Sequence, residues 1–224
     1  MTTQPKPGGD VSDQRLPEIT PGYFIDAAEV EDLYVRGLLS DCTTVFDIKP
    51  AMAALLTSGT PLTGGGTIEP GAMVRGDVIV GEGAVIEAGA MVDGPVYVGP
   101  GSVIAMGARV RDHSIIGPNC HIGWGAEIAR SLLVSDVRMK HVSFVGDSVL
   151  GRHVNVGAFV STTALRVNGG RVTEPATKEI TMLLGDRRIG TGQTKFGSVI
   201  ADDTAVPAGA VLQPGTLIGP GTIL

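Results

Sequence analysis

The chain has 224 residues, long enough for one sizeable hydrophobic core, and aromatic residues make up only 4% of it. Its formal net charge of -6 argues against a nucleic-acid surface, because phosphate binding needs a basic field over the contact face. No run approaches the roughly 18 apolar residues that a membrane-spanning helix needs, and the polar N-terminus lacks the apolar segment of a signal peptide. We therefore expect a soluble, cytoplasmic protein with an aliphatic core.

Charge and cysteine content add two local expectations. Residues 130–195 contain 10 Lys and Arg against 5 Asp and Glu, so this part of an acidic chain could hold a small anionic ligand. The two cysteines, Cys42 and Cys120, lie far apart in sequence and form neither a Cys-x-x-Cys pair nor a disulfide framework. We expect both to be free thiols in a reducing compartment.

The first 60 residues differ in pattern from the rest of the chain. Residues 1–16 are rich in Pro, Gly, Asp and Gln, which predicts a disordered N-terminus. Residues 17–60 predict a small α/β appendage, with a strand at "YFI" (23–25) and a helix from about Ala27 to Leu39 capped by Asp26. A second helix is expected to begin at Pro50, because Pro is favoured at the first helical position.

From residue 68 onward an aliphatic side chain recurs at every sixth position. Gly, Pro and Asn lie between these positions and suit tight corners. Strands of a β-sandwich recur at about 8 to 12 residues, so the shorter spacing favours a parallel β-helix over residues 61–224, with one side chain per repeat in a continuous core. The first series comprises Ile68, Val74, Val80, Ile86, Val92, Val98, Ile104, Val110, Ile116, Ile122, Ile128 and Val134.

The repeat is interrupted twice. After Val134 the segment "SDVRMKH" replaces the pattern, which restarts in a shifted frame at Phe144, Leu150 and Val156. Residues 161–195 form a longer excursion, predicted to be a protruding loop or hairpin. Long excursions from a solenoid often form its binding face, so both interruptions are candidate functional regions. The repeat then closes with Ile200, Val206, Leu212, Ile218 and Leu224.

Runs of the form [Ile/Val]-Gly-x-x-x-x resemble the left-handed hexapeptide-repeat acyltransferases. Within them, "KHVSFVGDSVLGRHVNVGA" (140–158) is similar to the acetyltransferase domain of the bifunctional N-acetylglucosamine-1-phosphate uridyltransferases. The segments "ALRVNGG" (164–170) and "GQTKFGSVIADD" (192–203) resemble archaeal-type sugar-phosphate nucleotidylyltransferases with acetyltransferase tails. The resemblance covers about Ile68 to Leu224. It implies triangular coils of 18 residues, a homotrimer with active sites between subunits, and acetyl-CoA or another acyl-CoA as co-substrate.

The resemblance also assigns roles to residues. His141 lies where the family has its general base, which takes the proton from the amine as the tetrahedral intermediate forms. Glu127 lies where an essential carboxylate accompanies that base, Arg111 where an arginine holds the sugar phosphate, and Asn155 in a substrate-contacting motif. The remaining candidates are Phe144 and Arg166 for the substrate, and Ala158, Lys140 and Lys195 for the cofactor.

Three positions depart from the family pattern. Phe144 replaces a tyrosine, Ala129 a phosphate-binding lysine, and Ala164 an asparagine. These changes remove a hydroxyl, a cation and an amide from the acceptor side, which puts glucosamine 1-phosphate itself in question.

Simpler interpretations exist for several candidates. With 18-residue coils, Arg75, Asp93 and Arg111 stack as a ladder of alternating charge, and such pairs contribute only about 0.2–1 kcal/mol each. Glu127 likewise stacks on Arg109. His113, His121, His141 and His153 follow one another at intervals of 8, 20 and 12 positions. These intervals do not match the His-x4-His pair of the carbonic anhydrases in this superfamily, so no metal is expected.

The function predicted from the sequence is therefore acyl-CoA-dependent N-acyl transfer to an amino sugar, a sugar phosphate or a related small amine. Two alternatives stay open. One is a specialised transferase with a different acyl group or a non-sugar acceptor, because the departures concentrate on the acceptor side. The other is a catalytically degenerate trimer that serves as a binding or scaffold protein. No nucleic-acid or membrane partner is expected.

Overall fold

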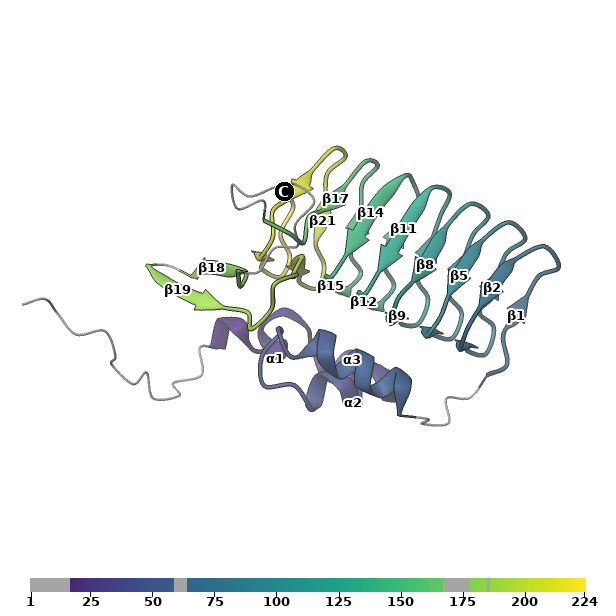
Figure 1. Ribbon diagram of the computed structural model, residues 1–224, viewed down its shortest axis with the longest axis horizontal. Coiled ribbons are helices and arrows are strands. Elements are labelled where there is room, and N and C mark those ends of the chain that lie inside the picture. The colour runs from purple at the N-terminus through teal and green to yellow at the C-terminus, as the bar shows by residue number, and fades with distance from the viewer. Residues whose placement is uncertain (1–16, 59–63, 167–177, 185) are drawn as a thin grey trace, which may run out of the picture.

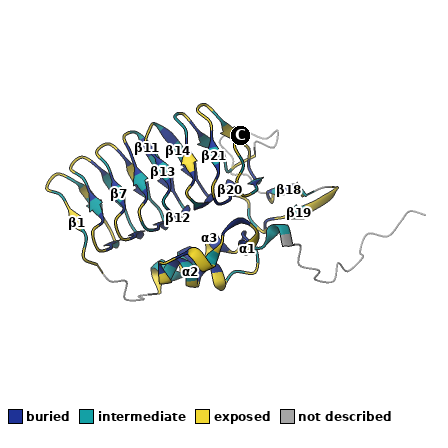
Figure 2. Cartoon of the chain, turned by 180° about the vertical axis from the view of Figure 1, so that it is seen from behind, coloured by how far each residue is buried: buried dark blue, intermediate teal, exposed yellow. Residues whose placement is uncertain are grey.

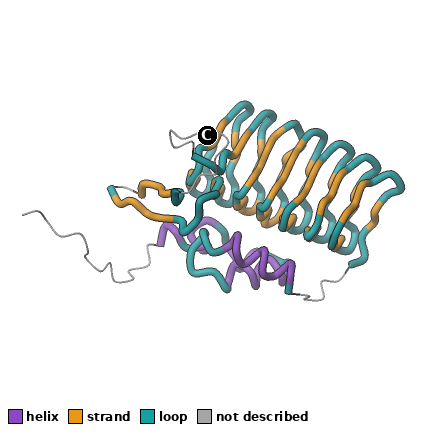
Figure 3. The backbone as a smooth tube through the Cα atoms, in the orientation of Figure 1, coloured by secondary structure: helices purple, strands orange, loops and turns teal. Residues whose placement is uncertain are grey.

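The computed structural model describes residues 17–58, 64–166, 178–184 and 186–224. Most of them form a left-handed parallel β-helix, a triangular prism whose three faces are parallel sheets of seven strands each (Figure 1). Helices from the N-terminal part lie along one face (Figure 3). The fold class predicted from the six-residue spacing is thus confirmed. Among the described residues, no helix has the length and apolar content needed to span a membrane.

The faces are called A, B and C in the order in which the chain enters them, and their shared edges AB, BC and CA. Face A contains β1 (Thr67–Ile68), β4 (Val85–Ile86), β7 (Val103–Ile104), β10 (His121–Ile122), β13 (Arg138–Met139), β16 (Asn155–Val156) and β21 (Ala205–Val206). Face B contains β2 (Met73–Arg75), β5 (Met91–Asp93), β8 (Arg109–Arg111), β11 (Ala126–Ala129), β14 (Ser143–Gly146), β17 (Ser161–Thr162) and β22 (Val211–Leu212). Face C contains β3 (Val78–Val80), β6 (Val96–Val98), β9 (Ser114–Ile116), β12 (Leu132–Ser135), β15 (Val149–Arg152), β20 (Ser198–Ile200) and β23 (Thr216–Ile218).

The interior of the prism is a continuous column of aliphatic side chains. Figure 2 marks the buried residues of the coils in dark blue. Ile86 pairs with Ile104 and Val92 with Val110, each 18 positions later, and all four are fully buried. Stacking of this kind removes each side chain from water only when a further coil covers it. Leu224, on the last coil, is 51% exposed, so its predicted burial is wrong.

The coils are not all the same length. Paired residues are 18 positions apart in the first coils but 17 apart between β10, β13 and β16. The missing residue belongs to edge BC. In one coil Asp112 and His113, both with positive φ (56° and 57°), turn this corner, whereas Arg130 (50°) and then Asp147 (54°) turn it alone in the next two.

This shortening corrects the predicted interior at two positions. Leu133, not Val134, pairs with Ile116 and continues the core, while Val134 packs on the outside of face C. Val145, not Phe144, is the buried core residue of β14. Side chains alternate between the two sides of a strand, so a shift of one residue turns Phe144 outward.

The N-terminal appendage is helical and packs on the outside of face C. It comprises two 3₁₀ turns, Pro17–Ile19 and Ala27–Glu29, and the α-helices α1 (Pro21–Phe24), α2 (Leu33–Ser40) and α3 (Ile48–Thr57). The predicted strand at residues 23–25 is wrong, because residues 21–24 form α1. The disorder predicted for residues 1–16 lies outside the described residues.

The single helix predicted from Ala27 is split in two. Asp26 caps the 3₁₀ turn by accepting from the N–H of Ala28 (3.1 Å), but Asp32 then starts α2 by accepting from the N–H groups of Tyr34 (2.9 Å) and Val35 (3.0 Å). Because Asp32 acts as a second N-cap six residues after Asp26, the 3₁₀ turn ends and a new helix begins there. The other Asp32 oxygen accepts from the buried Tyr97 hydroxyl on face C (2.7 Å), which ties α2 to the prism. Burial, followed by this hydrogen bond, raises the pKa of Tyr97.

The second interruption of the repeat leaves the prism between β17 and β20, again at edge BC. Its described part contains the antiparallel hairpin β18 (Thr181–Leu184) and β19 (Arg187–Gly190). The excursion packs on the appendage as well as on the prism. The Phe196 ring stacks edge-on against Phe46 with centroids 5.3 Å apart, and the Gln193 side chain donates to the Phe46 carbonyl (2.8 Å).

Candidate active site

His141 lies on edge AB, the corner between faces A and B. The register of the flanking strands places it between Trp124 in the preceding coil and Ala158 in the following one. His141 and Lys140 beside it are exposed, and no hydrogen bond joins the imidazole to another residue of the described chain. The edge therefore presents an accessible imidazole next to a cation.

The turn that carries His141 is fixed by Ser143. Its hydroxyl donates to the Gly157 carbonyl of the next coil (2.9 Å) and accepts from the N–H of Val160 (3.3 Å). On the other side, Gly123 lies directly against the turn, since a Cβ at Gly123 would be 2.2 Å from the Lys140 carbonyl oxygen. The backbone on both sides of His141 is thus held by neighbouring coils.

Edge AB also carries exposed apolar side chains. Met106 is 61% exposed, Trp124 62% and Phe159 68%. The Trp124 ring lies over the preceding coil, because a Cβ at Gly107 would be 2.5 Å from its Cδ1 atom. Neither Trp124 nor Phe159 therefore lies in the core of one chain.

Face B, next to edge AB, carries the predicted charge ladder. Arg75 pairs in register with Asp93, and Asp93 with Arg111, as the 18-residue spacing predicted. Ion pairs join Arg75 to Asp93 (3.7 Å) and Arg109 to Asp93 (3.3 Å). Arg111 Nε donates to Glu127 Oε1 (2.7 Å), and this hydrogen bond raises the pKa of Arg111. Arg111 and Glu127 are therefore partners of each other on one face.

Phe144 lies in register with Glu127 on the outside of face B. Its ring covers Gly146, because a Cβ at Gly146 would be 2.6 Å from the Phe144 Cζ atom. Ala129 pairs in register with Arg111 on the preceding strand of face B and with Gly146 on the following one, and it is fully buried. Where the family pattern has a lysine and a tyrosine, this face thus has an apolar patch formed by Ala129, Phe144 and Gly146.

Asp147 is a key residue that the sequence analysis did not single out. Its side chain is 3% exposed and accepts from Lys49 Nζ (2.6 Å) and from Arg130 Nε and Nη2 (3.0 Å each). Burial raises the pKa of Asp147, but the hydrogen bonds from Arg130 and Lys49 outweigh it and hold the pKa below its ordinary value. Its position at the end of "HVSFVGD" was the available signal, but Lys49 lies 98 positions away.

Asp147 is connected to the ladder of face B. Arg130 Nη1 also donates to Asp112 Oδ2 (3.0 Å), and Asp112 pairs in turn with Arg111. A continuous chain of ion pairs therefore runs from α3, through edge BC, to Glu127. Burial lowers the pKa of Lys49, and Asp147 opposes this shift.

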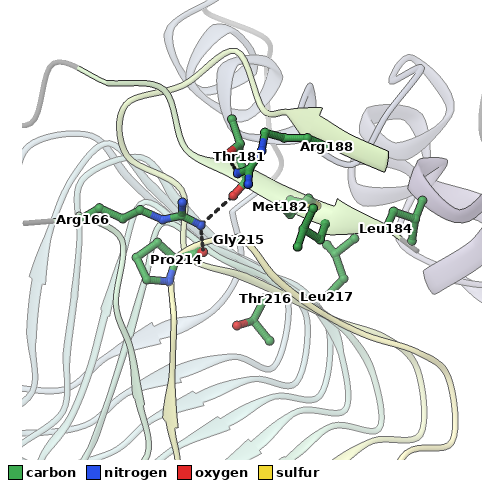
Figure 4. Close-up of a pocket in the computed structure, with 10 residues that line it drawn as sticks. Arg166, Thr181, Met182, Leu184, Arg188, Pro214, Gly215, Thr216 and Leu217 are labelled. Carbon is green, nitrogen blue, oxygen red and sulfur yellow. Dashed lines mark hydrogen bonds between the residues drawn. The ribbon is translucent and has the colours of Figure 1, made fainter. Parts of the chain in front are cut away.

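The other predicted site residues lie elsewhere. Asn155 is exposed on face A beside Arg138, and so faces away from Glu127. The Lys195 carbonyl accepts from Lys49 Nζ (2.7 Å), which places Lys195 beside α3. Arg166 lies at the hairpin (Figure 4). One chain thus brings together Arg111, Glu127 and Phe144 on face B and Lys140, His141 and Ala158 on edge AB, but not Asn155, Arg166 or Lys195.

The remaining histidines have other surroundings. His121 lies in register with Arg138 on face A, and burial, followed by Lys140 and Arg138, lowers its pKa. His153 lies on edge CA and contacts Asp203 Oδ1 through Nδ1 (3.0 Å). Within the described residues, no group of three His, Cys, Asp or Glu side chains is arranged to hold a metal ion.

Known proteins with similar sequences are of the kind that the sequence resembles. Residues 92–184 match a family model described as the GMPPB C-terminal domain. The chain is 32% identical to the bifunctional protein GlmU of Methanococcus vannielii over 203 residues, which are 90% of this chain and 46% of that protein. It is 30% identical to the bifunctional protein GlmU of Methanocaldococcus jannaschii over 198 residues, 88% of this chain and 46% of that protein.

A shorter match joins 93 residues, 42% of this chain, to 21% of a bifunctional sugar-1-phosphate nucleotidylyltransferase/acetyltransferase of Sulfurisphaera tokodaii, at 31% identity. Among solved structures, a mutant of perosamine N-acetyltransferase from Caulobacter crescentus, in complex with CoA and GDP-perosamine, aligns over 80% of this chain and 62% of its own at 17% identity. The TM-score of this alignment is 0.27. The protein relatives confirm the resemblance identified in the sequence, and the chain spans less than half the length of each.

Proposed function

We propose that this protein is an acyl-CoA-dependent N-acyltransferase that acetylates an amino sugar, a sugar phosphate or a related small amine, with His141 as the general base. The observation that supports it most is the position of His141, exposed on edge AB in the segment that resembles the bifunctional acetyltransferases. The proposal concerns the chain itself, because the match covers only 46% of the length of each GlmU relative.

The chemistry requires one base and one site for developing negative charge. The amine nitrogen attacks the thioester carbonyl and forms the new N–C bond, and the carbonyl electrons move to oxygen. His141 takes the amine proton as this intermediate forms. Collapse of the intermediate breaks the C–S bond, and the proton passes to the departing thiolate, so an amide and free CoA result. Lys140 lies beside the imidazole and would attract the phosphates of CoA.

We further propose that a homotrimer completes the site. His141 has no hydrogen-bonding partner in the described chain, and the candidates on faces A and B point in different directions from one prism. Face C is covered by the helices of the same chain, which leaves faces A and B and the exposed apolar row of edge AB for contact with other copies.

The trimer has its own test. Light scattering should give three times the chain mass. Mixing the inactive variants His141→Ala and Glu127→Gln by joint refolding should restore part of the activity if a site takes these residues from two different subunits. A monomer in solution would contradict the proposal.

The apolar patch on face B bears on the acceptor. Ala129 and Phe144 offer no cation and no hydroxyl there, which supports an acceptor that does not place a phosphate against this patch. A specialised acceptor or a different acyl group is therefore the second candidate function. Substituting Ala129→Lys and Phe144→Tyr together should raise activity with glucosamine 1-phosphate if this patch selects the acceptor.

The decisive experiment measures thiol release from acetyl-CoA with a panel of amino sugars, their phosphates and simple amines. His141→Ala should lower the acceptor-dependent rate by roughly 10²–10⁴-fold, the usual contribution of a general base. His153→Asn is the matched control, because His153 lies on edge CA and should be dispensable. No binding of acetyl-CoA, together with no thiol release across the panel, would refute the proposal and favour a non-enzymatic protein.

A further inference from the structure

A hollow of about 520 Å³ separates the hairpin β18–β19 from the last coils of the prism. Two arginines from different segments line it. Arg166 follows β17, and Arg188 lies on β19 (Figure 4). The hollow lies on the excursion at edge BC, whereas His141 lies on edge AB.

Both guanidinium groups are held at Thr181. Arg166 Nη2 donates to the Thr181 carbonyl (2.6 Å) and more weakly to the Pro214 carbonyl (3.4 Å). Arg188 Nη1 donates to the Thr181 hydroxyl (2.9 Å). Figure 4 shows both side chains reaching this threonine from opposite sides. Each guanidinium has five N–H donors, so most of them remain available to a ligand.

Neither arginine is neutralised in the described chain. No carboxylate of the described residues lies within ion-pair distance of Arg166 or Arg188, and both side chains are exposed. The arginines of face B and edge BC differ in this respect, since Arg75, Arg111 and Arg130 all have acidic partners. The hollow is therefore a place of uncompensated positive charge, inside the segment whose sequence carries the Lys and Arg excess.

The rest of the lining is largely apolar. Met182, Leu184 and Leu217 contribute side chains, and Gly215 lines the hollow beside them. Pockets for small molecules combine an apolar wall with a few converging polar groups in this way, and their volumes are typically about 300–1,000 Å³.

We propose that this hollow binds the phosphate group of a phosphorylated small molecule, with Arg166 and Arg188 as its ligands and the apolar wall against the rest of the molecule. Planar guanidinium groups match the oxygens of phosphate in pairs, and two of them balance a dianion. Their hydrogen bonds to Thr181 position both groups before the ligand arrives. The proposal does not rest on acyl transfer at His141.

Isothermal titration calorimetry on the full chain tests the proposal, with inorganic pyrophosphate as the first probe. Arg188→Gln removes the charge but keeps a donor for Thr181, so the fold should survive, which the melting temperature checks. Its affinity should fall roughly tenfold or more, as expected for loss of a charge-assisted hydrogen bond. Arg187→Gln, one residue earlier on the same strand and outside the hollow, is the matched control and should bind as the native chain does.

Paired ligands identify the source of the phosphate. Coenzyme A is compared with dephospho-CoA, which lacks the 3′-phosphate, and a hexosamine 1-phosphate with its free sugar. In one of these pairs the phosphorylated member should bind more tightly than its partner, and this difference should disappear in Arg188→Gln. That pair identifies the class of ligand. Equal losses in Arg187→Gln and Arg188→Gln would mean nonspecific charge attraction and overturn the proposal, as would a failure of every phosphorylated probe to bind. Binding through this hollow should persist in His141→Ala.

Discussion

Removing the Asp147 carboxylate should destabilise the protein through an unpaired buried charge. In Asp147→Ala, Lys49 loses its only carboxylate partner in the described chain while its side chain is 14% exposed. Arg130 keeps Asp112 and is 35% exposed, so it is affected less. Breaking a buried ion pair costs about 3–5 kcal/mol. Because only Lys49 is left without a carboxylate, and it keeps its hydrogen bond to the Lys195 carbonyl, we expect about 3 kcal/mol.

Urea unfolding followed by circular dichroism measures this loss. Asp112→Ala is the matched control, because Asp112 bonds the same Arg130 but is 42% exposed, and pairs of this kind contribute about 0–1 kcal/mol. In the double variant Lys49→Met/Asp147→Ala, part of the loss should be recovered, since no charge remains buried alone. Equal destabilisation by Asp147→Ala and Asp112→Ala would refute the reasoning from burial.

Three further outcomes are expected. The folded-state pKa of Asp147 is depressed, so its contribution to the free energy of unfolding is complete above the ordinary carboxyl pKa of about 3.9. This contribution is lost as the pH falls through the lower folded-state pKa. The difference in stability between the native protein and Asp147→Asn should therefore disappear in acid unfolding. The methyl group in Gly123→Ala would meet the Lys140 carbonyl and displace the turn that carries His141. This overpacking should cost about 1–3 kcal/mol of stability and lower the rate of thiol release. Gly22→Ala, with open space around it, should change neither the stability nor the rate. Burial raises the pKa of Cys120 to about 12, so iodoacetamide at pH 8 should leave it unmodified by mass spectrometry until the protein is unfolded.

The local sequence was sufficient for the architecture. Each hexapeptide carries its own aliphatic residue and its own corner residues, and each coil contacts only its neighbours, so the period alone predicts which side chains stack. The pairing of Arg75 with Asp93 and of Asp93 with Arg111 was predicted from the 18-residue coil for this reason.

The same reasoning failed where a corner changed length. Nothing in the local pattern distinguishes Leu133 from Val134 as the core residue, because both are aliphatic and both are buried, one inside the prism and one under the helices. Only the backbone at Arg130, which turns edge BC with a single residue, decides between them. The orientation of Phe144 follows from that decision.

For the candidate site, the sequence by itself determined which residues belong to a recognisable segment, and only the tertiary structure decided which of them meet. His141 and Ala158 share edge AB because the coil between them has 17 residues, whereas the 18-residue coil predicted from the sequence would have stacked His141 on Phe159. The contact of Lys49 with Asp147 depends on how the appendage docks on the prism, a packing of surfaces that are 98 positions apart in the chain. Such contacts arise from the shape and charge of folded surfaces, and no period in the sequence records them.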